Sequence, residues 1–219
     1  MVVLSFSHIC VVASWALLLL PAVNALPLKD CDCRGAISSD NSSFCGDPRL
    51  GPAPLPKSDK LVGPLLDHYK RLGGLCPDAF LAKYTDPATK AFIFPPVSGF
   101  QNSNTGAPIE GNQTLVPGML LDRFGFEGGS FLAPAFTPYG QRSLPPSSLN
   151  TPVNASTANY FVYKVLKEFT VLTGTIAPWF EQPGQGTQYL SPFSVSTLLT
   201  MGWLERVEAR SVTSSYLPP

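Results

Sequence analysis

Arginine, aromatic and glutamine side chains lie beside glycines in the second half of the chain. Arg123 and Phe124 precede a glycine-rich run, Arg142 precedes two prolines, and Gln188 follows Gly186. A guanidinium in a semi-apolar loop suits phosphate, because it donates paired hydrogen bonds to anionic oxygens. Glycines let the backbone approach a ligand closely. These residues indicate an anion-binding cleft, and the alternative is that the arginines are structural ion-pair partners and the aromatics belong to the core.

The common catalytic motifs are absent from the sequence. It contains no P-loop, no H-E-x-x-H, no G-x-S-x-G and no complete G-x-G-x-x-G. After residue 25 the sole histidine is His68, which we expect on the surface or in packing. A Ser-His-Asp or Cys-His enzyme is therefore not expected.

Residues 1–25 are expected to be a cleavable signal peptide. The apolar run at residues 9–20 has the length of a signal-peptide core and is too short to span a bilayer. Small side chains at Val23 and Ala25 place cleavage after Ala25. The alternative is a buried helix of the mature fold. No other segment is long and apolar enough to cross a membrane, so we expect a secreted protein.

Four cysteines follow the expected cleavage site. Cys31, Cys33, Cys45 and Cys76 would form two disulfides in an oxidising compartment. A Cys31–Cys33 bridge is disfavoured because its one-residue loop is strained. Cys31 and Cys33 are therefore expected to reach Cys45 and Cys76, in either order. The alternative is a zinc site made by the four thiols.

The exported chain carries three sequons, at Asn41, Asn112 and Asn154, each in a polar stretch where a glycan could stay in water. All three are expected glycosylation sites.

The composition limits the partners and the fold. Fifteen basic residues balance fifteen acidic ones, which argues against nucleic acid or an anionic membrane surface as a partner. Only 14% of residues are charged and 23 are proline, a combination typical of a compact, loop-rich, mixed or β-dominated fold. The tail after Arg210 has no acidic cluster, so no metal site is expected there.

The first part of the chain is expected to be helical and cross-linked. Residues 26–56 are irregular, and a helix is predicted over residues 64–72, with Gly73-Gly74 ending it. A short helix is predicted to start at Pro77. The Gly-, Asn- and Pro-containing stretch at 98–111 is expected to be a linker.

The second part is expected to be rich in β-structure. Residues 160–166 and 169–172 are dense in aromatic and β-branched side chains and predict strands that could be successive. A helix is predicted after Ser191-Pro192, ending at Gly202, with a last strand at 203–207.

Six stretches of the second half carry a family resemblance, and they occur in family order. They are Asp122-Arg123-Phe124-Gly125, Gly129-Ser130-Phe131-Leu132-Ala133-Pro134, Arg142-Ser143-Leu144-Pro145-Pro146, Tyr160-Phe161-Val162-Tyr163, Ala177-Pro178-Trp179-Phe180 and Gly186-Thr187-Gln188-Tyr189. The run from Val116 to Val207 resembles the TNT domain, named after the tuberculosis necrotizing toxin, an NAD glycohydrolase module. It is most similar to the secreted fungal NADases, which join this domain to a disulfide-bonded N-terminal extension.

The resemblance implies an α+β fold. A β-sheet-centred TNT-type core at residues 106–219 would follow a small, disulfide-bonded, mainly helical N-terminal extension at residues 26–105. It also implies a secreted protein, located extracellularly or on the cell or spore surface. A homodimer is left open.

The resemblance further implies cleavage of the nicotinamide–ribose bond of NAD(P)⁺, which is the substrate, with no cofactor and no metal. Nicotinamide leaves as a neutral amine and needs no general acid, so the enzyme must position the dinucleotide and stabilise an oxocarbenium-like ribose.

The resemblance carries over four catalytic positions. Arg123 and Arg142 would clamp the pyrophosphate, Phe124 would pack on the nicotinamide or its ribose, and Gln188 would hydrogen-bond the ribose and orient water. Expected substrate-binding residues are Ser130, Phe131, Leu132 and Thr187.

Some bacterial relatives carry a functional histidine near the strand where this chain has Phe161, so a histidine-dependent mechanism does not transfer. Water could be activated by Asp122, Glu127 or Glu181. The alternatives are an ADP-ribosyl transferase or cyclase on the same fold, and a non-catalytic secreted surface protein.

Overall fold

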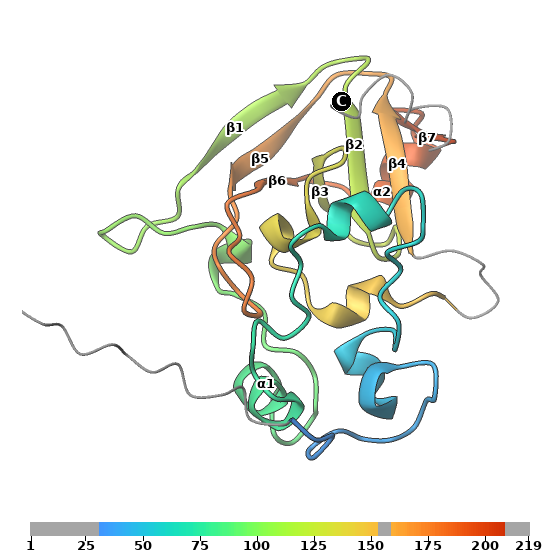
Figure 1. The fold of residues 1–219 in the computed structure, drawn as a ribbon. Helices are drawn as coiled ribbons and strands as arrows, with labels where there is room; N and C mark the ends of the chain where they lie inside the picture. The colour runs from blue at the N-terminus through green and yellow to red at the C-terminus, as the bar shows by residue number, and fades with distance from the viewer. Residues whose placement is uncertain (1–30, 153–158, 209–219) are drawn as a thin grey trace, which may run out of the picture.

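One antiparallel sheet dominates the upper half of the molecule (Figure 1). The computed structural model describes residues 31–152 and 159–208. The expected signal peptide and the sequon at Asn154 lie outside the described residues. Within them, seven strands pair in the order β1-β5-β6-β3-β2-β4-β7. The strands are β1 (Glu110–Leu115), β2 (Leu120–Phe124), β3 (Phe131–Pro134), β4 (Tyr160–Val165), β5 (Phe169–Thr175), β6 (Thr187–Leu190) and β7 (Leu204–Val207).

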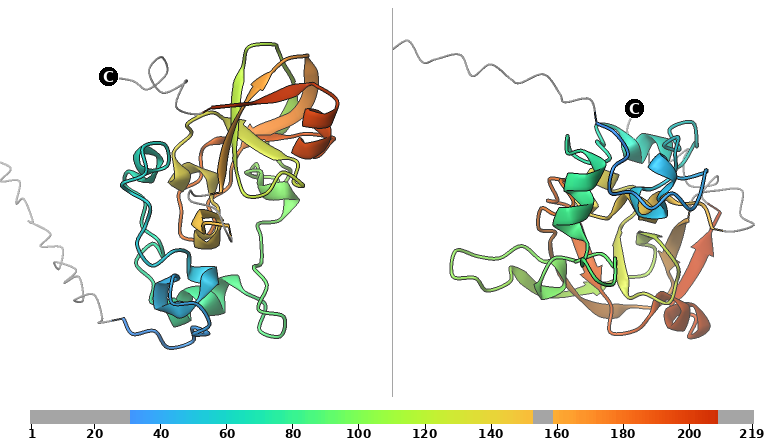
Figure 2. Two further views of the ribbon diagram at one scale, coloured as in Figure 1. Left: turned by 90° about the vertical axis from the view of Figure 1, so that its right-hand side faces the viewer. Right: turned by 90° about the horizontal axis from the view of Figure 1, so that it is seen from below.

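The sheet is curved (Figure 2). It separates two hydrophobic cores. One core includes Leu121, Tyr163 and Val165, together with Val195 and Leu198 of helix α2 (Val195–Thr200). The other core lies on the opposite side of the same strands and includes, among others, Phe124, Tyr160 and Val162. Successive residues of a strand point to opposite faces, so β4 is buried on both. The α+β class with a sheet-centred core is confirmed.

Helix α2 begins one turn later than the sequence suggested. Its N-cap is Ser194, whose hydroxyl accepts a hydrogen bond from the Thr197 amide at 3.2 Å. Ser191-Pro192 lies in the preceding turn. The predicted last strand is confirmed as β7, and the strands predicted at 160–166 and 169–172 are confirmed as β4 and β5. These two are not neighbours in the sheet, because β6, β3 and β2 lie between them.

Two disulfides hold the N-terminal extension together. Cys31 is bonded to Cys76 and Cys33 to Cys45. Both expected partners are therefore reached, and the zinc alternative is wrong. Within the described residues, no group of three or more His, Cys, Asp or Glu side chains could hold a metal ion.

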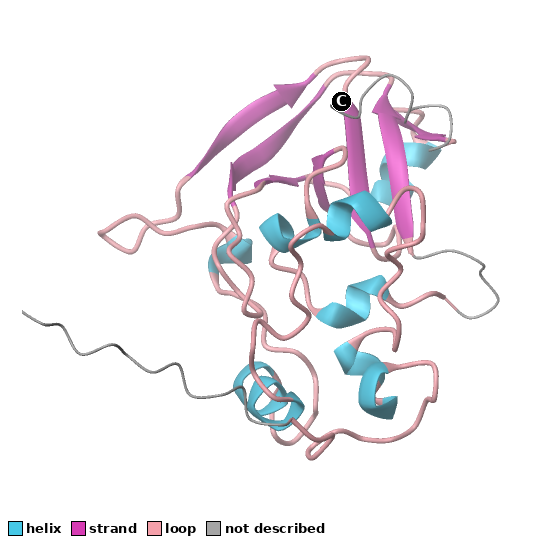
Figure 3. Ribbon diagram, in the orientation of Figure 1, coloured by secondary structure: helices cyan, strands magenta, loops and turns pink. Residues whose placement is uncertain are grey.

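The extension is less helical than expected (Figure 3). Its one α-helix among the described residues is α1 (Pro77–Tyr84), which confirms the helix predicted at Pro77. The other helices there are short 3₁₀ turns: η1 (Phe44–Gly46), η2 (Pro48–Leu50), η3 (Gly63–Leu66) and η4 (Val97–Gly99).

The predicted helix at 64–72 is wrong beyond its first turn. The 3₁₀ turn η3 ends at Leu66, and His68 adopts a positive φ of 58°. The apolar side chains of this segment serve two different cores. Leu66 and Tyr69 pack with the sheet, whereas Leu72 packs with Phe80 of α1. A single straight helix could not place these apolar side chains in two separate cores.

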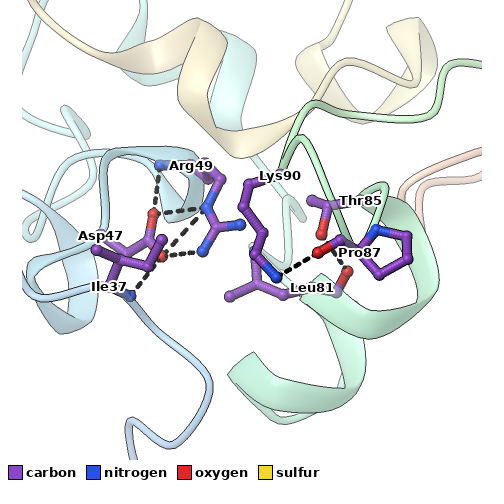
Figure 4. Close-up of polar contacts among 7 residues, drawn as sticks. All are labelled: Ile37, Asp47, Arg49, Leu81, Thr85, Pro87 and Lys90. Carbon is purple, nitrogen blue, oxygen red and sulfur yellow. Dashed lines mark hydrogen bonds and ion pairs between the residues drawn. The ribbon is translucent and has the colours of Figure 1, made fainter.

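Buried polar contacts fix the turns of the extension (Figure 4). The Asp47 side chain is 1% exposed and accepts hydrogen bonds from the amides of Ile37 (2.9 Å) and Arg49 (3.0 Å). It also pairs with the Arg49 guanidinium at 2.6 Å. A buried carboxylate is tolerated only when its oxygens are satisfied in this way.

The extension and the sheet share hydrophobic cores. Val62, Leu65, Leu66 and Tyr69 of the extension pack in the core that contains Phe124. Phe180, from the loop between β5 and β6, packs among the α1 side chains. The expected linker is held against the sheet, since Gln101 donates its amide to the Thr175 carbonyl at 2.8 Å.

Among the described residues, no helix is long and apolar enough to pass through a membrane.

Candidate active site

A pocket opens where β2, β3 and β6 lie side by side in the middle of the sheet (Figure 1). Its empty space, which includes open solvent at the mouth, is about 330 Å³. It is lined by Asp122, Arg123, Phe124, Phe131, Leu132, Ala133, Arg142, Leu144, Ile176 and Gln188. All four expected catalytic side chains therefore meet in one pocket.

Arg142 is brought to the pocket by the 3₁₀ turn η5 (Tyr139–Arg142) and fixed there by Asp122. Arg142 is 6% exposed and Asp122 is fully buried. The guanidinium donates two parallel hydrogen bonds to the carboxylate, Nη1 to Oδ1 at 2.5 Å and Nη2 to Oδ2 at 2.7 Å. The Arg142 Nε also donates to the Thr137 carbonyl at 2.9 Å. The charge of Arg142 is therefore compensated inside the protein, and only its remaining N–H groups can serve a ligand.

Every oxygen of the Asp122 carboxylate is in use. Besides Arg142, its Oδ2 accepts from the Phe136 amide and from the Tyr160 hydroxyl, both at 2.7 Å. Burial, followed by the Asp122 charge, raises the pKa of the Tyr160 hydroxyl, so Tyr160 remains a donor at neutral pH. This saturated carboxylate has a structural role.

Arg123 differs from Arg142 in how its charge is balanced. Its Nε donates to the Phe126 carbonyl at 3.0 Å and its Nη1 to the Phe131 carbonyl at 2.7 Å. Among the described residues, no carboxylate forms an ion pair with it. Burial lowers the pKa of the Arg123 guanidinium, the expected effect of placing an uncompensated cation in low dielectric. An incoming anion would relieve that cost.

Gly129 makes room for this arginine. A Cβ atom at position 129 would lie 2.0 Å from Arg123 Nη2, so any larger residue would displace the guanidinium. The glycine run noted in the sequence therefore serves the arginine side chain directly.

Phe124 forms an aromatic wall of the pocket. Its ring packs on Tyr160 and Tyr139 at centroid distances of 4.6 and 4.9 Å, and the Arg142 guanidinium lies 5.2 Å from its centroid. The residue is 5% exposed. Phe131, at 39% exposure, presents a second and more accessible aromatic surface.

Gln188 reaches the pocket from β6, and its amide is held by the extension. The Nε2 group donates to the Ser98 carbonyl at 2.8 Å. Ser98 belongs to the 3₁₀ turn η4, ninety residues earlier in the chain.

Two of the expected substrate-binding residues do not line this pocket. Ser130 uses its carbonyl to accept from the Ser191 amide at 3.0 Å, and Thr187 borders a separate depression beside Glu110 and Gln113. Phe131 and Leu132 do line the pocket.

The other carboxylates proposed for water activation are engaged elsewhere. Glu127 accepts from the Tyr163 hydroxyl at 2.9 Å and pairs with Arg206, whose hydrogen bond lowers the pKa of Glu127. Glu181 pairs with Lys83 at 2.5 Å across a different surface depression. Neither lines the pocket, and both pairings weaken a carboxylate as a base.

Sequence reasoning did not single out Ala133, Leu144 and Ile176, which complete the lining. Ala133 and Leu144 lie inside the family stretches, whereas Ile176 precedes one of them. The Ser98 carbonyl was also missed, because no side-chain type signals a backbone acceptor.

Comparison with known proteins identifies the family of this chain. Residues 114–207 match the family model described as TNT, tuberculosis necrotizing toxin. The chain is also 49% identical over 178 residues to a protein of Aspergillus fumigatus, and the match covers 80% of this chain and 76% of that protein. The chain therefore belongs to the TNT family. The Aspergillus relative is named conidial surface nicotinamide adenine dinucleotide glycohydrolase nadA.

Solved structures show a looser likeness. The tuberculosis necrotizing toxin in complex with its immunity factor gives a TM-score of 0.44 at 20% identity, covering 71% of this chain and 88% of the toxin chain. Rhs1-CT in complex with its cognate immunity protein gives 0.31 at 18% identity, covering 45% and 77%. The family assignment rests on the sequence.

Proposed function

We infer that this chain is an NAD glycohydrolase, which cleaves the nicotinamide–ribose bond and releases nicotinamide and ADP-ribose. The observation that carries this inference is the 49% identity to a named NAD glycohydrolase over most of both chains. The pocket supports it, because Arg123 and Phe124 of β2 meet Arg142 of η5 and Gln188 of β6 there.

Arg123 is the better candidate for the pyrophosphate. Its guanidinium is bonded to carbonyls alone, whereas the Arg142 charge is neutralised by Asp122. Two negative phosphates are attracted most strongly by an uncompensated cation in a partly buried site. Arg142 would add directional N–H donors without adding net charge.

The reaction does not require a strong acid or base. Nicotinamide departs from a cationic glycoside as a neutral amine, and the electron-poor ribose carbon then accepts water. The one carboxylate lining the pocket, Asp122, has its oxygens occupied. Gln188 is proposed to hold the ribose hydroxyls and the attacking water in position, an interaction that strengthens as charge develops.

The test is to incubate the purified protein with NAD⁺ and separate the products chromatographically. Equal amounts of nicotinamide and free ADP-ribose support hydrolysis. A cyclic product identifies a cyclase, and ADP-ribose attached to protein identifies a transferase. No release of nicotinamide refutes the proposal and supports a non-catalytic surface protein. A parallel reaction with NADP⁺ tests whether the 2′-phosphate is accepted.

We further propose that the enzyme is secreted and acts extracellularly or on a cell or spore surface. The disulfides support an oxidising compartment, and Asn41 and Asn112 are exposed where glycans could be attached. Intact-mass analysis of the secreted protein, before and after glycosidase treatment, should give a mature chain starting at Leu26 with attached glycans. An unprocessed, unglycosylated chain would contradict this.

A further inference from the structure

The turn that holds Gln188 has an unusual backbone. Val97, Ser98 and Gly99 have φ values of 54°, 55° and 83°, so three consecutive residues lie in the left-handed region. This conformation is unfavourable for a β-branched residue such as Val97. Strained backbone persists where the surroundings hold it in place, and it is concentrated at functional sites.

Neighbouring contacts hold this turn against the sheet. The Ala177 amide donates to the Gly99 carbonyl at 2.9 Å. Phe100, 2% exposed, packs over Gly174, where an added Cβ would lie 2.7 Å from the Phe100 ring. The turn is thus fixed to β5 and to the loop that leads to β6.

The Ser98 carbonyl is the group that this arrangement presents to Gln188. It accepts the Gln188 Nε2 hydrogen bond at 2.8 Å, which selects the amide orientation with nitrogen toward the turn. A glutamine side chain has several rotatable bonds, so an unanchored amide would populate several orientations. Anchoring one end reduces the loss of entropy when the other end binds substrate.

We propose that the turn Val97–Gly99 is a positioning element for the reaction: its Ser98 carbonyl fixes the Gln188 carboxamide, so that the N-terminal extension completes the active site. The proposal rests on the proposed function. Ser98 acts through Gln188 by its backbone, and its exposed side chain has no part in the effect.

Two variants at one position separate the backbone from the side chain. Ser98→Pro forces φ to a negative value and moves the carbonyl, while the Ser98 amide donates no described hydrogen bond that proline would remove. Ser98→Gly accepts the positive φ and keeps the carbonyl in place. We expect Ser98→Pro to lower kcat at least about tenfold with a smaller change in KM, and Ser98→Gly to stay within about twofold of the wild type.

A double-mutant cycle shows whether the effect passes through Gln188. Gln188→Ala should lower kcat by about 10²–10³, and adding Ser98→Pro to it should cause almost no further loss. Full activity of Ser98→Pro, or an equal loss in both backgrounds, overturns the proposal. If Ser98→Pro does not fold, Gly99→Ala serves, since its Cβ would strain the turn at φ 83° and lie 3.7 Å from Gln188 Oε1.

The two hypotheses fail in different ways. A wild-type protein that releases no nicotinamide refutes the proposed function. An active wild type whose Ser98→Pro variant is equally active refutes only the role of the turn.

Discussion

Asp122 and Arg142 form a buried pair in the pocket wall, with Tyr160 as a third partner. Such a pair contributes little net stability when intact, but removing one partner leaves the other charge buried and unpaired. The position of Arg142 in the pocket and the stability of the fold are therefore linked through one carboxylate.

The variant Asp122→Asn tests this link. It should lower the free energy of unfolding by about 3–5 kcal/mol, because the Arg142 charge loses its compensation. Tyr160→Phe is the milder control, since it removes a single hydrogen bond to the carboxylate and should cost about 1–3 kcal/mol. Denaturant unfolding measures both. An Asp122→Asn variant as stable as the wild type would show that the pair is not the structural anchor described here.

The contrast between the two arginines gives a second prediction. Arg123→Lys keeps the charge but loses the fork that binds two oxygens. Loss of a charged hydrogen bond of about 1.5–3 kcal/mol would weaken NAD binding about 10- to 100-fold. Steady-state kinetics should show this as a higher KM. Arg49→Lys, in the extension and paired with Asp47, is the control and should leave KM unchanged. An unchanged KM in Arg123→Lys would show that Arg123 does not bind the phosphates.

The family resemblance singled out Arg123, Phe124, Arg142 and Gln188, which residue types alone would not have done. The structure brings the four residues into the lining of one pocket. Sequence could not predict which arginine is neutralised, since Asp122 of β2 and Arg142 of η5 are twenty residues apart and meet only in the folded structure. It also could not predict the Ser98 carbonyl, which depends on backbone conformation alone.

At the scale of elements, strands buried on both faces were the easiest to predict. Five of the six residues of β4 are aromatic or β-branched, because each face contacts a separate core. The sequence did not predict β1, whose first two residues fell in the expected linker at 98–111. It is an edge strand with a polar, glycine-containing sequence and mostly exposed side chains. Its pairing with β5 depends on partners far along the chain, from Leu115 with Phe169 to Glu110 with Gly174.

Helix α1 is tied to the loop between β5 and β6 by Glu181. The carboxylate accepts from Lys83 at 2.5 Å and from the Tyr84 hydroxyl at 2.8 Å. The Lys83 hydrogen bond is the main cause of the lowered pKa of Glu181, whose ordinary value is 4.5. A lowered folded-state pKa means that this contact stabilises the fold above about pH 4.5, and that the contribution disappears as pH falls through the folded-state value.

Glu181→Gln should therefore lower the melting temperature at pH 7. The difference from the wild type should shrink as the pH falls from about 5 to about 3. Glu168→Gln, at an exposed glutamate, is the matched control and should show little difference at any pH. Differential scanning calorimetry across this range provides the measurement. A constant difference at all pH values would mean that the contact stabilises through packing and not through its charge.

At the scale of the whole molecule, the extension contributes side chains to the hydrophobic core that contains Phe124. Phe124, Tyr160 and Val162 of the sheet would be uncovered without Val62, Leu65, Leu66 and Tyr69. The expected division at residue 105 runs through two hydrophobic cores, those of Phe124 and Phe80, which take side chains from both parts. The core that contains Leu121 belongs to residues 106–219 alone.

A fragment of residues 106–219 should for this reason fail to fold into an active enzyme. Burying one large apolar side chain contributes about 1.5–3 kcal/mol, so exposing several at once removes a free energy comparable to the 5–15 kcal/mol that stabilises a typical domain. The fragment would also lack the Ser98 carbonyl that holds Gln188. Near-ultraviolet circular dichroism and NAD cleavage, measured beside the full exported chain, test both losses. A fragment that unfolds cooperatively but is inactive would show that the extension is needed for the active site and not for folding. A fragment that is folded and fully active would show that the shared core is dispensable.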